Sequence, residues 1–175
     1  MISHHPSLPP REISNESLIS HTIVEQMSLQ TDIIFVKALR SNTTLMAQLP
    51  AGDVYNTTIA LPDEDMDNAP VPYIIVTFDG MQNEDQTKDG YEGDTDRVQI
   101  GIEVAAQNRP QLGELVSAVR NTVREFFENI TDADEDYNLT PQDYALSAGP
   151  VSYDQDKPCY WQVLSYNCDT TPDQS

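Results

Sequence analysis

The chain has 175 residues and a formal charge of −20, from 9 Lys and Arg against 29 Asp and Glu. A chain of this length can bury one hydrophobic core, and a second full domain is not expected. The charge would repel a phosphate backbone and an anionic membrane surface, which disfavours sequence-specific nucleic-acid binding. The sequence also has no secretory signal pattern and no apolar run long enough to span a membrane, so we expect a protein made and used in water.

The N-terminal part predicts an extension followed by helix. Residues 1–28 are expected to begin flexibly and to form one helical segment capped by Ser14 or Asn15. Residues 29–40 predict a helix, because their apolar side chains fall on one side: Ile34, Phe35, Ala38 and Leu39.

A second, short helical turn should follow, capped by Asn42 or Thr43 and ended by Pro50 and Gly52. Its apolar residues are Leu45, Met46 and Leu49. A short extended piece is expected around Val54 and Tyr55. Residues 62–72 hold three prolines and four acids, which predicts a loop.

Two strands are predicted next. Residues 73–78 are β-branched and aromatic on both alternating faces, which is typical of a central strand ended by Asp79-Gly80. Residues 81–94 are polar and are expected to form a loop. In 98–105 Val and Ile alternate with mostly polar residues, which predicts an amphipathic strand.

The strongest helical pattern covers residues 109–129. From Leu112 to Ile130 the large apolar side chains recur along one face of a 3.6-residue period. Asn108 is the expected cap, with Pro110 in the first turn and Gln111 three residues after the cap.

The C-terminal part predicts a hairpin after an acidic loop at 132–143. Residues 144–146 and 151–153 read as one edge or bulged strand interrupted at Gly149-Pro150. Residues 154–157 predict a turn into a last strand at 160–166. Cys159 and Cys168 have an odd separation, so on one strand they point to opposite faces and should be free thiols.

These elements predict an α+β fold, in which an antiparallel or mixed four-stranded sheet packs against a long helix, with an N-terminal helix. The expected organisation is an N-terminal extension at 1–28, the α+β domain at 29–168 and a C-terminal tail at 169–175.

No residue pattern indicates catalysis or a cofactor. Asp63-x-Asp65-x-Asp67 and Asp132-x-Asp134-x-Asp136 imitate the start of a calcium loop, but neither has the Gly and Glu that complete one. The three histidines lie in the N-terminal extension, away from both cysteines, and no nucleotide-binding or hydrolase motif occurs. We expect no enzyme activity, no metal and no cofactor.

Two groups of residues have two interpretations each. Arg120 and Arg124 lie on the flank of the long helix, where they either pair with acids of that helix such as Glu125 and Glu128 or meet acidic loops of a neighbouring subunit. Trp161, with nearby tyrosines, either packs in the core or on the sheet, or forms a contact surface.

The segment from Asp67 to Val76, DNAPVPYIIV, resembles the start of the tail-completion and tail-terminator proteins of long-tailed bacteriophages. The similarity continues through a polar loop, a strand like 97–104, a helix like 109–129 with the stretch AVRNTV at 118–123, and a closing hairpin like 144–166. It covers about 29–168. Residues 1–28 and the acidic inserts at 62–69 and 131–143 depart from the pattern.

The resemblance implies a virion protein assembled in the host cytoplasm. Such a subunit forms a ring, commonly a hexamer, that caps the tail tube at the head-proximal end of the tail and meets neck or head-completion proteins. Genomic DNA would pass through the ring without specific binding, and no membrane is involved. The expected contacts are the loops at 79–94 and 131–143, the N-terminal extension, and these residues: Asp89, Tyr91, Asp94, Arg120, Arg124, Asp134, Asp136 and Trp161.

Two alternatives stay open from the sequence. One is a head-closure or neck adaptor, or a relative of the tail-tube protein, since all of these share ring symmetry. The other belongs to a different class and is a small acidic protein-binding module.

Overall fold

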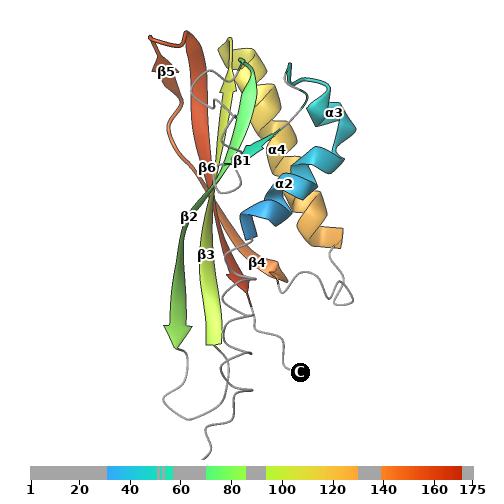
Figure 1. Ribbon diagram of the computed structural model, residues 1–175, viewed down its shortest axis with the longest axis vertical. Coiled ribbons are helices and arrows are strands. Elements are labelled where there is room, and N and C mark those ends of the chain that lie inside the picture. The colour runs from blue at the N-terminus through green and yellow to red at the C-terminus, as the bar shows by residue number, and fades with distance from the viewer. Residues whose placement is uncertain are drawn as a thin grey trace, which may run out of the picture.

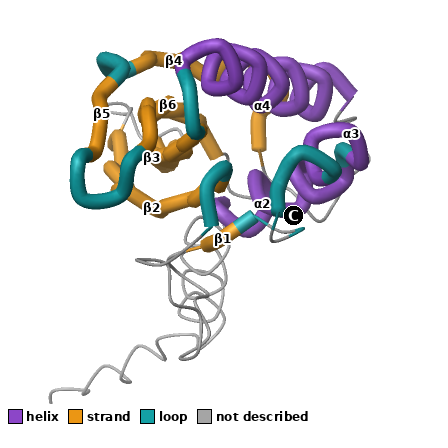
Figure 2. Tube along the Cα trace, turned by 90° about the horizontal axis from the view of Figure 1, so that it is seen from above, coloured by secondary structure: helices purple, strands orange, loops and turns teal. Residues whose placement is uncertain are grey.

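The computed structural model describes residues 31–50, 52, 54–56, 70–85, 94–129 and 139–170. Figure 1 shows the helices together on one side of the sheet, and Figure 2 shows β5 on the side away from α2 and α3. The expected α+β fold is confirmed. The elements are α2 (Thr31–Ser41), α3 (Thr43–Met46), β1 (Tyr55–Asn56), β2 (Tyr73–Asp85), β3 (Asp94–Ala106), α4 (Arg109–Asn129), β4 (Leu139–Ala148), β5 (Ser152–Asp154) and β6 (Cys159–Thr170).

The sheet has six strands within the described residues, so the expected number of four is wrong. Their order is β1-β2-β3-β6-β4, and β5 also pairs with β6. β1 runs parallel to β2, whereas the other pairs are antiparallel. The difference has two causes: β1 contains only two residues, and the interrupted strand expected before the last turn forms two separate strands, β4 and β5.

The hairpin strands β2 and β3 are longer than the sequence predicts. A shift of register between Phe78 and Gly80 lets β2 pass Asp79 as a bulge, and pairing continues to Asp85 opposite Asp94. Both ends of the loop expected at 79–94 therefore belong to strands. Likewise, β4 begins at Leu139, inside the expected acidic loop. Inter-strand hydrogen bonds join backbone groups, so polar side chains do not prevent pairing.

The long helix α4 starts where the sequence predicts. The Asn108 Oδ1 atom accepts a hydrogen bond from the Gln111 amide at 3.0 Å, and the Asn108 carbonyl accepts one from the Leu112 amide. The Gln111 side chain in turn accepts from the Gln107 amide at 3.1 Å. These bonds satisfy amides that have no partner inside the helix, which fixes where α4 begins.

The main core lies between the sheet and the helices, and its largest side chains form an aromatic cluster. Phe35 of α2 packs edge-on against Phe127 of α4 and tilts against Tyr166 of β6, with ring centroids 5.6 and 5.4 Å apart. Tyr144 of β4 stacks on Phe127 at 4.8 Å. Because four elements meet in this cluster, it fixes α2 and α4 on the sheet.

A smaller cluster occupies the opposite face of the sheet. It consists of Tyr73, Ala105 and Cys159, with Trp161 partly buried against it. Cys168 belongs to the main core, so the two cysteines point to opposite faces of β6, as predicted, and both are free and buried.

Several expectations lie outside the described residues. These are the extension at 1–28, the loop over 62–69 and both acidic triplets at 63–67 and 132–136. The limits of the expected domain stay a prediction.

Candidate functional site

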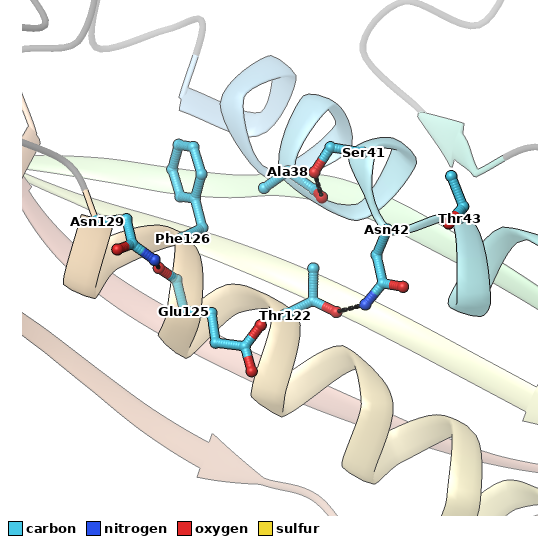
Figure 3. Close-up of a pocket in the computed structure, with 8 residues that line it drawn as sticks. All are labelled: Ala38, Ser41, Asn42, Thr43, Thr122, Glu125, Phe126 and Asn129. Carbon is cyan, nitrogen blue, oxygen red and sulfur yellow. Dashed lines mark hydrogen bonds between the residues drawn. The ribbon is translucent and has the colours of Figure 1, made fainter.

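A groove of about 460 Å³ runs between the α2–α3 junction and the C-terminal half of α4. Figure 3 shows the two walls facing each other, with residues more than 70 positions apart brought side by side. One wall is formed by Ala38, Ser41, Asn42 and Thr43, and the other by Thr122, Glu125, Phe126 and Asn129.

Asn42 holds the two walls together. Its Oδ1 atom accepts a hydrogen bond from the Leu45 amide at 3.0 Å and so caps α3, while its Nδ2 atom donates to the Thr122 hydroxyl at 2.7 Å. Thr122 is only 6% exposed, and its hydroxyl donates to the Ala118 carbonyl. The Asn42 side chain thus fixes the start of α3 and ties the junction between α2 and α3 to α4.

The remaining polar groups of the groove are largely used within their own helices. The Ser41 hydroxyl donates to the Ala38 carbonyl, and the Asn129 amide group donates to the Glu125 carbonyl, both at 2.7 Å. Glu125 is the one ionisable side chain in the lining. One carboxylate beside hydroxyl and carboxamide groups can make hydrogen bonds with a bound polar segment.

Arg120 and Arg124 lie where the sequence predicts, exposed on α4. Arg124 pairs with Glu128 one turn later, with its Nε atom 3.7 Å from the carboxylate oxygen. Both side chains are more than half exposed, and such pairs contribute little stability. This agrees with pairing along the helix for Arg124; whether either arginine also meets a neighbouring subunit stays a prediction.

Trp161 is partly buried on the helix-free face of the sheet. It packs there in the same cluster as Tyr73. The Tyr73 hydroxyl donates to the Glu103 carboxylate at 2.8 Å, and the centre of the Tyr73 ring lies 4.5 Å from the Lys157 ammonium. Burial, and then the bond to Glu103, raises the pKa of the Tyr73 phenol above its usual value. Trp161 therefore packs on the sheet, and whether it also forms a contact surface stays a prediction.

Of the other expected contact residues, Asp94 begins β3. Asp89, Tyr91, Asp134 and Asp136 lie outside the described residues. Within the described ranges no group of three or more His, Cys, Asp or Glu side chains is arranged to hold a metal ion.

The sequence did not predict two exposed apolar side chains, Val151 just before the short strand β5 and Tyr153 within it. Tyr153 tilts against Tyr160 at 4.9 Å, and the Arg109 guanidinium lies 5.7 Å from the centre of the Tyr160 ring. A signal was present in the sequence, since no charged residue occurs at 144–153.

No helix in the part of the chain that the structure describes combines the length and the hydropathy needed to cross a membrane.

Comparisons with known proteins identify no family for this chain. No protein-family model matches it. No curated protein sequence matches it either. Among solved structures 26 chains match, one of them from a structure described as "Virion of native gene transfer agent (GTA) particle". That match has 14% identity and a TM-score of 0.44, and it covers 78% of this chain and 91% of the other. Values this low assign neither family nor function.

Proposed function

We propose that this protein is a structural, non-enzymatic component of a bacteriophage virion, and more specifically a tail-terminator or tail-completion subunit. The order of elements supports this best. The residues Tyr73-Ile-Ile-Val76 begin the strand β2. It is followed by β3, the long helix α4 and the closing strands β4 to β6. This is the order that the resemblance to tail-completion proteins implies.

The proposed subunit works as one copy in a closed ring, commonly six-fold. It caps the tail tube and joins it to the neck or head-completion proteins. A ring of identical chains uses one heterologous contact repeatedly, so each copy needs two different contact surfaces. A formal charge of −20 per chain suits a lumen through which DNA passes without sticking.

The groove favours a structural role over an enzymatic one for a physical reason. Its walls supply hydrogen-bonding side chains, one carboxylate and one aromatic ring, Phe126. This composition suits contact with a protein segment, whereas it offers no proton-transfer pair. As a contact surface the groove is available to a tube or neck partner.

The proposal is tested by the mass of the purified chain in solution and by its presence in particles. A ring predicts a species of about six times the 19.6 kDa chain mass in mass photometry or sedimentation velocity. Antibodies against the chain should then label purified virions at the head-proximal end of the tail. A chain that is monomeric at all concentrations and absent from virions contradicts the proposal, and labelling at another level of the particle favours a neck adaptor or tube protein.

A further inference from the structure

One edge of the sheet has two long uncharged stretches. Residues 144–153, which cover the second half of β4 and the first two residues of β5, contain no Asp, Glu, Lys or Arg, and the same holds for 158–168, which covers most of β6. These stretches lie side by side, because β4 and β5 both pair with β6. Across the whole chain 22% of residues are charged, so these uncharged stretches are a local property of this surface.

This edge is also open for contact within the described residues. β4 ends the strand order, and β5 pairs only with β6. Val151 and Tyr153 are the exposed large apolar side chains of the described residues, at 39% and 52%. Soluble proteins usually protect sheet edges with charged side chains, especially Lys, or with Pro. Here Pro150 separates β4 from β5, but the protecting charge is missing.

The aromatic side chains at this edge are held in place before any partner binds. Tyr153 leans on Tyr160, and the Arg109 guanidinium lies against the Tyr160 ring. The following turn is fixed by the Asp154 carboxylate, which accepts from the amides of Asp156 and Lys157. An ordered aromatic surface loses little conformational entropy on binding. We call Val151, Tyr153, Tyr160 and Arg109 the β5 patch.

The charge of the chain indicates what covers this patch. Two copies at −20 repel each other over most orientations, so they can approach only where local charge is small. At the β5 end of the sheet charges of both signs lie close together, with Asp154, Asp156 and Glu103 against Lys157 and Arg109, so the local net charge is small. Residues 158–168 beside them are uncharged. A basic partner would instead be drawn to the acidic parts of the chain.

We infer that the β5 patch is a contact between copies of this chain, in which Tyr153 and Val151 are buried against a neighbouring copy. The inference deepens the proposed ring function, since it names one of the two contact surfaces of each subunit. Only ring closure rests on that function; the contact itself requires a second copy and no other virion protein.

The test compares Tyr153→Glu with two matched controls. Tyr153→Phe keeps the ring of the side chain, and Asn121→Glu adds the same negative charge at an exposed position of α4, about 18 Å along the helix from Arg109. Self-association is measured by sedimentation velocity over a wide concentration range. Thermal unfolding of each variant verifies that it is folded, which is expected because Tyr153 is half exposed.

The expected result is that Tyr153→Glu weakens self-association at least about 30-fold, as loss of a central aromatic contact does. Tyr153→Phe and Asn121→Glu should change it less than about threefold. Val151→Glu should act in the same direction as Tyr153→Glu.

The remaining outcomes separate this inference from the ring. If the unaltered chain forms rings and folded Tyr153→Glu forms them equally well, the inference is overturned and the ring stands. If the unaltered chain forms pairs that Tyr153→Glu abolishes but never a ring, the contact stands and the proposed function fails. A chain that is monomeric throughout overturns the inference, and it overturns the proposed function as well if the chain is also absent from virions.

Discussion

A methyl group at Gly101 would lie 2.5 Å from Thr77 Oγ1 and 2.6 Å from Asp79 Oδ2. These two side chains hydrogen-bond to each other across the bulge of β2, with Thr77 donating to Asp79 at 2.8 Å. The strand β3 therefore needs a residue without a side chain at this position, because anything larger displaces that pair.

Gly101→Ala should lower the free energy of unfolding by about 0.5–1.5 kcal/mol, since the new methyl group fits only if the Thr77 and Asp79 side chains move and their hydrogen bond is lost. Gly113→Ala is the matched control: Gly113 is exposed in α4 and a methyl group there meets nothing within 4 Å. In a helix that change should raise stability by about 0.5–1 kcal/mol. Urea denaturation of both variants measures the difference, and shifts of the same sign would contradict this account.

At the scale of elements, Asn42 is the joint between α2, α3 and α4. Asn42→Ala should cost about 1–2 kcal/mol, because it removes both the cap of α3 and the bond to Thr122. Asn42→Ser is the control, since serine still caps a helix but is too short to reach the Thr122 hydroxyl. Chemical denaturation should place it between Asn42→Ala and the unaltered chain. Equal losses in the two variants would show that the bond to Thr122 contributes nothing.

The elements also differ in how well the sequence predicts them. The boundaries of α4 could be predicted because its apolar period is long and Asn108 caps it. The ends of β2 and β3 could not, because polar hairpin residues carry no apolar alternation. The two-residue β1 depends on pairing with Ile75 and Val76, which only the tertiary structure provides.

The candidate site was less predictable than the fold for a related reason. The groove joins Asn42 to Thr122, and no local pattern links two residues so far apart. For Trp161 the sequence alone did not give the side of the sheet, whereas the register of β6 places it opposite Ala105 on the helix-free face. Of the loops expected to make contacts at 79–94 and 131–143, residues 86–93 and 131–138 lie outside the described residues.

At the scale of the whole molecule, the interior holds thiol and phenol groups whose burial favours their neutral form. Burial raises the pKa of the Cys168 thiol from 9.0 to about 12, and burial also raises the pKa of the Tyr166 phenol. Within the described residues the Tyr166 hydroxyl is buried and has no hydrogen-bond partner. On the other face of the sheet, burial raises the pKa of Cys159 as well. Buried groups on both faces of the sheet therefore ionise at a higher pH than they would in water.

This predicts an alkaline limit to stability. Because the pKa of Cys168 is raised in the folded chain, the thiol of the unfolded chain ionises at a lower pH. The contribution of the neutral thiol to the free energy of unfolding is therefore complete below about pH 9 and is lost as the pH rises toward 12. For Cys168 alone the free energy of unfolding should fall by about 2 kcal/mol between pH 8 and 10.5. Urea denaturation at a series of pH values measures this slope. Cys168→Ala should flatten it between pH 9 and 10, before tyrosines contribute. An unaltered chain whose stability is constant to pH 11 would contradict the prediction, and a Cys168→Ala slope equal to that of the unaltered chain would assign the effect to Cys159 instead.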